Sequence, residues 1–143
     1  MRVAYRWWSI VVFVMVDLQV GFAGYGAFYT VHKLNPDGAT INENTFEDGF
    51  GIHAGFGYLV VLSGLILLVI GASTGIGKWR LGRHGVLAGL LILQVLLAWF
   101  GSETPVIGFF HPVNALVIFS LSGWIAVDQW RGRSMREHVP ASA

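Results

Sequence analysis

The chain has 143 residues, of which 55% are hydrophobic and 12% are charged, with a formal net charge of +1. This composition is too apolar for a soluble domain of this length and is typical of an integral membrane protein. A net charge near zero gives no support to nucleic-acid binding. The chain has no cysteine, which excludes disulfides, thiolate metal sites and cysteine nucleophiles, so any metal site would use histidine, carboxylate or a cofactor.

Four apolar runs are long enough, or nearly so, to cross a hydrocarbon core that needs about 20 helical residues. They predict helices over residues 7–30, 50–72, 84–101 and 109–128. We therefore expect an all-α integral membrane protein, with a single transmembrane domain over residues 1–143 folded as a four-helix up-down bundle. The predicted connections include an outer loop over 31–49, which contains the turn signal Asn35-Pro36-Asp37-Gly38, and a cytoplasmic tail over 129–143.

The basic residues predict the orientation, because cytoplasmic loops of membrane proteins carry an excess of lysine and arginine. Lys33 is the only one of the nine basic residues that falls on the side of the outer loop. The other eight precede the first run, lie between the second and third runs, or follow the fourth. Both termini are thus predicted to lie on the cytoplasmic side. The protein itself is expected in the cell membrane of a bacterium or archaeon.

Two of the apolar runs begin with a histidine, His53 in the second run and His111 in the fourth. Gly49 and Gly57 lie four residues before and four residues after His53 on the same helical face, which leaves room there for a flat group. Ala115 is a small residue four positions past His111. The pattern predicts that both histidines face a flat cofactor.

The expected topology also brings these two histidines to one depth. The second and fourth helices run in the same direction and are diagonal in an up-down bundle, with axes about 14 Å apart when adjacent axes are about 10 Å apart. That gap suits two imidazoles on opposite faces of one porphyrin, whereas a bare metal ion needs closer imidazoles and more ligands. Pro112 is expected in the first helical turn, where its missing N–H costs little. The alternative for each histidine is an interfacial or hydrogen-bonded structural role.

The third and fourth runs also resemble a known family. The stretch Leu90-Leu91-Ile92-Leu93-Gln94-Val95-Leu96-Leu97-Ala98-Trp99-Phe100-Gly101 is followed by a short turn and by Phe110-His111. It looks like part of one four-helix half of the haem A synthase family, in which a Leu-Leu-Gln-x-Leu-Leu-Gly stretch precedes a histidine-bearing helix. His53 takes the place of the histidine that opens the second helix there. The resemblance, much of which small membrane b-type cytochromes share, implies one haem b held by His53 and His111 near the outer surface.

The chain also departs from that family. Its 143 residues contain no second four-helix half and no outer-loop cysteine pair, and Phe50 stands where the family has a glutamate. We therefore expect an electron-transfer or redox-sensing cytochrome rather than an enzyme. A haem-handling enzyme related to the synthases and a haem-free scaffold or transport subunit remain alternatives. The expected partners are membrane lipid, a redox partner protein or a quinone, and further copies or subunits of a membrane complex.

Two other histidines receive weaker predictions. His32 ends the first run on the outer side, where it is expected either to touch a haem edge or propionate or to be a solvated interfacial residue. His84 opens the third run at the opposite end, with no partner expected at its depth. A second haem bound by two histidines is therefore not expected.

A second polar layer is predicted midway through the membrane. Asp17 and Gln94 lie at the same depth on helices that run the same way, about 15 Å in at a rise of about 1.5 Å per residue. Asp17 shares a face with Gly21 and Gly24, which is expected to turn it toward the bundle. Because an intramembrane carboxyl is costly, the prediction is either a structural hydrogen bond between Asp17 and Gln94 or a proton relay.

Overall fold

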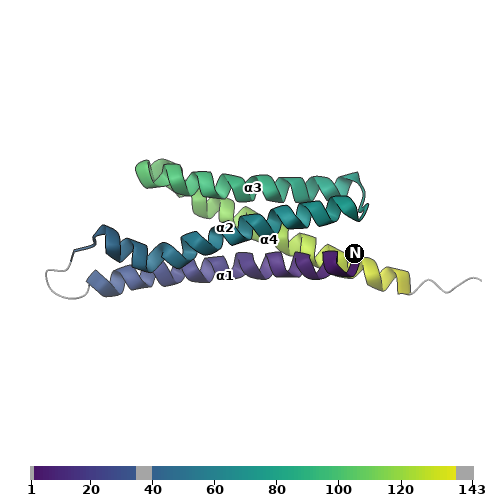
Figure 1. Ribbon diagram of the computed structural model, residues 1–143, viewed down its shortest axis with the longest axis horizontal. Coiled ribbons are helices and arrows are strands. Elements are labelled where there is room, and N and C mark those ends of the chain that lie inside the picture. The colour runs from purple at the N-terminus through teal and green to yellow at the C-terminus, as the bar shows by residue number, and fades with distance from the viewer. Residues whose placement is uncertain (1, 35–39, 138–143) are drawn as a thin grey trace, which may run out of the picture.

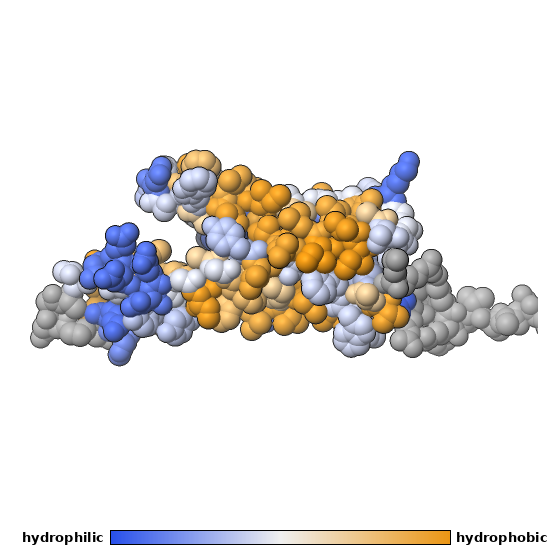
Figure 2. Space-filling view, viewed as in Figure 1, coloured by the Kyte–Doolittle hydropathy of each residue, from blue (hydrophilic) through white to orange (hydrophobic). Residues whose placement is uncertain are grey.

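The computed structural model describes residues 2–34 and 40–137. These residues form four helices, α1 (Arg2–Leu34), α2 (Glu43–Ser73), α3 (Lys78–Glu103) and α4 (Pro105–Glu137), as Figure 1 shows. Each helix is long and apolar enough to cross a membrane, which confirms the predicted all-α, multi-pass architecture. In Figure 2 an apolar belt covers the middle of the visible face, and hydrophilic residues gather toward both ends of the molecule.

The helices pack as an antiparallel ring. Each helix contacts the next along the chain, and α1 closes the ring against α4. The diagonal pairs are therefore α1 with α3 and α2 with α4, as the sequence predicted. We call the end of the bundle that carries the α1–α2 and α3–α4 connections the loop end, and the opposite end the terminal end. Figure 1 shows the α1–α2 and α3–α4 hairpins diverging toward the loop end.

The helices are longer than the apolar runs predicted. The 33 residues of α1 span about 50 Å, which exceeds a hydrocarbon core of about 30 Å. The helical backbone continues into polar residues at both ends, whereas an apolar run marks only the membrane-crossing part. The predicted outer loop over 31–49 shrinks accordingly, because α2 already begins at Glu43, where the Asn42 side chain accepts a hydrogen bond from the Thr45 N–H (2.9 Å). The predicted turn at residues 35–38 lies outside the described residues.

The α3–α4 connection is a single residue, Thr104, and α4 begins with Pro105. The prediction for Pro112 was therefore wrong, since this proline lies inside α4 rather than in its first turn. A proline inside a helix leaves the carbonyl four residues before it without its usual backbone donor, which here is the carbonyl of Gly108. The predicted tail over 129–143 also differs, because α4 continues to Glu137.

The apolar core fills the terminal half of the bundle. Its buried members come from all four helices: Tyr5, Val12, Val16, Val60, Leu67, Leu87, Leu91, Ile118 and Ile125. On α1 the buried positions recur at alternating steps of four and three residues, which places one narrow stripe against the neighbouring helices. This packed half holds the bundle together while the hairpins separate toward the loop end.

His84 has hydrogen-bond partners that the sequence analysis did not predict. The Nδ1–H of His84 donates to the Arg80 carbonyl (2.7 Å), so its Nε2 accepts from the hydroxyl of Tyr5 (2.8 Å). The Gln129 amide in turn donates to the Tyr5 oxygen (3.0 Å). Tyr5 and His84 are both 2% exposed, so this chain of hydrogen bonds joins α1, α3 and α4 inside the terminal end.

Candidate functional site

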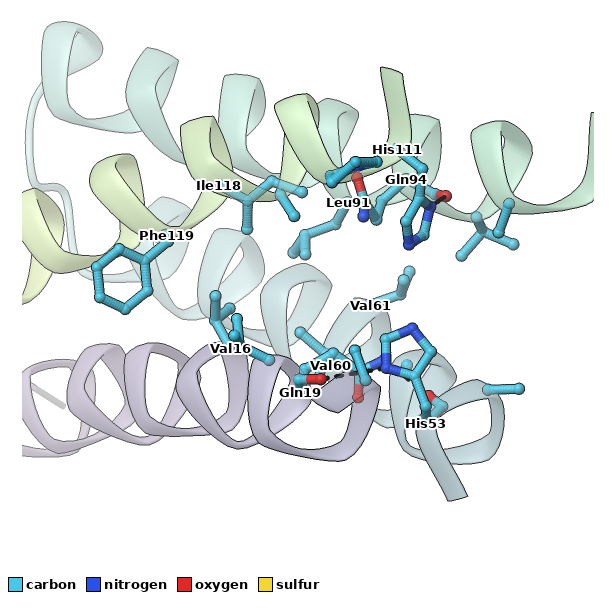
Figure 3. A pocket seen from close by; sticks show the side chains of 18 of the residues that line it. Val16, Gln19, His53, Val60, Val61, Leu91, Gln94, His111, Ile118 and Phe119 are labelled. Carbon is cyan, nitrogen blue, oxygen red and sulfur yellow. Dashed lines mark hydrogen bonds between the residues drawn. The ribbon is translucent and has the colours of Figure 1, made fainter. Parts of the chain in front are cut away.

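His53 on α2 and His111 on α4 lie opposite each other across the bundle. Their ring centroids are 6.2 Å apart, with 67° between the ring planes. Figure 3 shows both rings reaching into the space between the two hairpins and facing one another. The structure therefore brings together the two residues that the sequence selected, from the diagonal helices that it predicted.

Each imidazole is held by a backbone carbonyl of the other helix in its own hairpin. The Nδ1–H of His53 donates to the carbonyl oxygen of Gln19 (3.1 Å), and that of His111 donates to the carbonyl oxygen of Gln94 (3.0 Å). A carbonyl can only accept, so Nδ1 carries the proton and Nε2 keeps its lone pair. Metal-binding histidines commonly have this second hydrogen bond, which fixes the tautomer and the ring orientation.

The rings face a cavity of about 780 Å³. This volume falls within the range of about 300–1,000 Å³ that is usual for pockets holding cofactors and small ligands. Small side chains line it on all four helices, namely Ala23, Gly57, Ala98 and Ala115. The two predicted small residues Gly57 and Ala115 thus border the space in front of the histidines.

The two hairpins repeat one sequence pattern, which the predictions from the sequence did not include. Residues 18–26 and residues 93–101 share Leu-Gln-Val-x-x-Ala-x-aromatic-Gly. The glutamine of each copy provides the carbonyl that holds a histidine, and the alanine of each copy lines the cavity. This repeat was the signal that could have identified Gln19 as the counterpart of Gln94.

The glycine that ends each repeat lies where the helices of its hairpin come close. A Cβ added to Gly101 would lie 2.6 Å from the Gly108 Cα, and one added to Gly49 would lie 3.1 Å from the Gly26 carbonyl oxygen. Gly49 therefore packs against α1 and does not line the cavity, which corrects its predicted role beside a flat cofactor. The close approach brings each histidine within reach of the carbonyl on the neighbouring helix.

The two glutamine side chains differ in their partners. Gln94 accepts a hydrogen bond from the amide of Asn114 (2.7 Å), which also donates to the Leu90 carbonyl (3.0 Å). Gln19 donates to the His53 carbonyl (2.7 Å), while its Oε1 is buried with no hydrogen-bond partner among the described residues. The predicted hydrogen bond between Asp17 and Gln94 is not formed, because α1 and α3 are diagonal and Asn114 on the adjacent helix lies closer.

Asp17 and His32 are the two remaining residues of the predicted site. Asp17 borders the cavity but is exposed. A Cβ added to Gly21 or Gly24 would meet nothing within 4 Å, so these two glycines do not pack against a neighbouring helix as predicted. The expected direction was wrong because an apolar helix has residues suited to lipid on every side. His32 is exposed and does not line the cavity.

The site offers two nitrogen lone pairs and little else for a metal. Among the described residues, no group of three or more histidine, aspartate or glutamate side chains is arranged to hold a bare metal ion. Histidine nitrogens bind a transition metal at about 2.0–2.1 Å, so two imidazoles on opposite sides of one ion have centroids on the order of 6 Å apart. The 6.2 Å separation of His53 and His111 fits this arrangement. The remaining ligands would then come from a cofactor.

Comparison of the chain with protein-family models, with curated proteins and with solved structures finds no match in any of the three.

Proposed function

We propose that this chain is a membrane b-type cytochrome in which His53 and His111 bind the iron of one haem from opposite faces. The observation that carries the proposal is the matched pair of imidazoles. Their centroids are 6.2 Å apart, and each Nδ1–H is engaged by a backbone carbonyl, which leaves Nε2 as the ligand atom. A porphyrin provides the four remaining iron ligands that the protein does not offer.

The surroundings of the two histidines support a flat, apolar cofactor. The lining of the cavity is mostly hydrophobic and includes Val16, Val60, Val61, Leu91 and Ile118. Every helix contributes at least one small residue to the lining, and Ala23, Gly57, Ala98 and Ala115 are at corresponding positions in the two hairpins. Such apolar walls suit the faces of a porphyrin, and the two hydrogen-bonded rings would hold its iron.

Electron transfer or redox sensing is the activity that this ligand set favours. Haem bound by two histidines supplies a one-electron couple with both axial positions filled. The hydrogen-bonded imidazoles limit rearrangement of the ligands when the charge of the centre changes. A haem-handling enzyme related to the synthases would in addition need access for a substrate to the iron. Two histidine ligands on that iron would hinder such access.

The same proposal includes the setting of the cytochrome. The protein lies in a bacterial or archaeal cell membrane with both termini in the cytoplasm, so the haem is nearer the outer surface. A redox partner protein or a quinone exchanges the electron. The chain acts as a homo-oligomer or as a subunit of a larger membrane complex.

Colour and redox response test the proposal directly. The full chain, purified from a membrane in detergent with haem supplied during expression, is expected to be red, with a Soret band that shifts when dithionite is added. Extraction of the pigment into alkaline pyridine then identifies the haem type. A colourless, folded protein that fails to bind added haem would contradict the proposal and support a haem-free scaffold.

The buried histidine at the terminal end provides an internal comparison. His84→Ala is expected to leave the haem spectrum unchanged, because His84 lies in the terminal half, away from the cavity. It removes a buried hydrogen-bond acceptor of Tyr5, at a cost of about 1–3 kcal/mol in the free energy of unfolding. Spectra and thermal unfolding of the purified variant measure both effects. Loss of the Soret band in a folded variant would mean that haem binds elsewhere.

A further inference from the structure

Asp17 is the one carboxylate among the residues that line the cavity within the described part of the chain. The other titratable side chains around the cavity are His53 and Tyr58 on α2 and His111 on α4, and α3 contributes none. No lysine or arginine of the described residues lines it. The cavity therefore provides no cationic side chain that could compensate the charge of an ionised Asp17.

The position of Asp17 along α1 makes that charge costly. Asp17 is 15 residues past Arg2 and 17 residues before Leu34, so it lies about 20 Å or more from either end of the helix. The described ion pairs of the chain involve Asp128 at the terminal end, bound by Arg80 and Arg83. A carboxylate near the middle of a membrane needs a compensating charge, a proton or access to water.

A haem in this site would supply the compensating charge in only one oxidation state. With two neutral imidazoles and the propionates left aside, the core of iron(III) and the porphyrin dianion would carry a charge of +1, whereas the iron(II) core would be neutral. A bound metal is often the largest local charge in a site and changes the protonation of its neighbours. An ionised Asp17 is thus balanced by the oxidised centre and loses that balance on reduction.

We propose that Asp17 is the proton-binding group coupled to haem reduction, an inference that rests on the proposed haem site. One electron from a one-electron donor converts iron(III) to iron(II). One proton from the aqueous phase forms an O–H bond with the Asp17 carboxylate, so the total charge in the cavity is unchanged. Reoxidation releases the electron and the proton together. The chain would then couple electron transfer to the uptake of one proton by the Asp17 side chain.

The pH dependence of the midpoint potential tests this coupling. Where Asp17 is ionised beside the oxidised centre and protonated beside the reduced one, the potential falls by up to about 59 mV for each tenfold decrease in proton activity, for one electron and one proton. Asp17→Asn is expected to remove this slope and to raise the potential at high pH. Asp17→Glu is expected to keep the slope, because a carboxylate is retained.

Asp48→Asn is the matched control. It removes an equal formal charge from an exposed residue of α2 that does not line the cavity, where solvent and salt screen the charge. Its slope should equal that of the wild type. The haem propionates are common to all of these proteins, so a difference in slope between Asp17→Asn and Asp48→Asn is attributed to the Asp17 carboxylate. Redox difference infrared spectra should also show the C=O band of a protonated carboxyl on reduction, present in the wild type and absent in Asp17→Asn.

The outcomes separate this inference from the haem site itself. Equal slopes in wild type and Asp17→Asn, with the infrared band unchanged, would overturn the role of Asp17 even if both proteins contain six-coordinate haem. A change of oligomeric state in Asp17→Asn with an unchanged slope would overturn it too, because Asp17 would then serve contacts between chains. Absence of haem from the wild-type protein would instead remove the proposed function.

Discussion

Replacing either His53 or His111 by alanine is expected to abolish six-coordinate haem while the protein remains in the membrane. In the proposed site each imidazole would provide one of the two protein ligands, and the described lining of the cavity offers no other histidine. Loss of a hydrogen-bond partner of a metal ligand typically costs about 10–100-fold in affinity, and loss of the ligand itself should cost more. The haem-to-protein ratio and the Soret spectrum of the purified variants measure the effect.

Added imidazole sharpens this experiment. It should enter the space that the alanine leaves and restore a six-coordinate spectrum in both variants, whereas a misfolded variant would not respond. His32→Ala is the control, because His32 is exposed and does not line the cavity, and it should keep the spectrum of the wild type. A wild-type haem content in either His53→Ala or His111→Ala would show that the two residues are not the ligand pair.

Gly57→Leu is expected to prevent haem binding although both ligands remain. Gly57 lines the cavity one helical turn past His53, so a leucine there would project into the space proposed for the porphyrin. Leucine is otherwise favourable in a membrane helix. A haem-free bundle predicts at most a packing defect, because the added side chain would displace the Gln19 amide, 3.0 Å from the Cβ position. The haem-to-protein ratio, measured beside thermal unfolding, distinguishes the two results.

The same helix contains a matched control for this substitution. Gly55 is two residues away, does not line the cavity, and has no atom within 4 Å of an added Cβ. Gly55→Leu should therefore bind haem normally. Gly57→Ala should bind it as well, since Ala115 already provides a methyl group at the corresponding position of the other hairpin. Undiminished haem in a folded Gly57→Leu variant would show that Gly57 does not border the cofactor.

The long-range geometry of the histidines was predictable from the sequence. Apolar run lengths gave the number of helices, and the short connections made neighbours antiparallel, which places α2 and α4 on a diagonal. The position of His53 and His111 within their runs then gave a common depth. These arguments need only the rise of a helix and the thickness of a membrane.

The immediate surroundings of the histidines were less predictable. The acceptors of Nδ1 are backbone carbonyls, which no pattern of side chains reveals directly. Gly49, Gly21 and Gly24 were assigned to the wrong surface because helices that are apolar on all sides do not indicate which side faces the bundle. The ends of the helices were missed for a related reason, since polar residues can continue a helix beyond the membrane. The small residues Gly57 and Ala115 and the repeated Leu-Gln-Val pattern carried information about the surroundings of the two histidines.

That repeated pattern shows that the chain contains two similar hairpins in one polypeptide. Hairpins joined in this way need not have the same residue at corresponding positions. If two identical hairpins surrounded one cofactor, each side chain on one side would have an identical copy on the other side. In the single chain the halves differ: Ile92 corresponds to Asp17, and Phe56 corresponds to Asn114. One half can therefore carry a single carboxylate, Asp17, while in the other half the Asn114 amide donates a hydrogen bond to Gln94. A homodimer of identical hairpins would have to carry two carboxylates or none, so a single carboxylate beside the paired histidines requires two halves that differ in sequence.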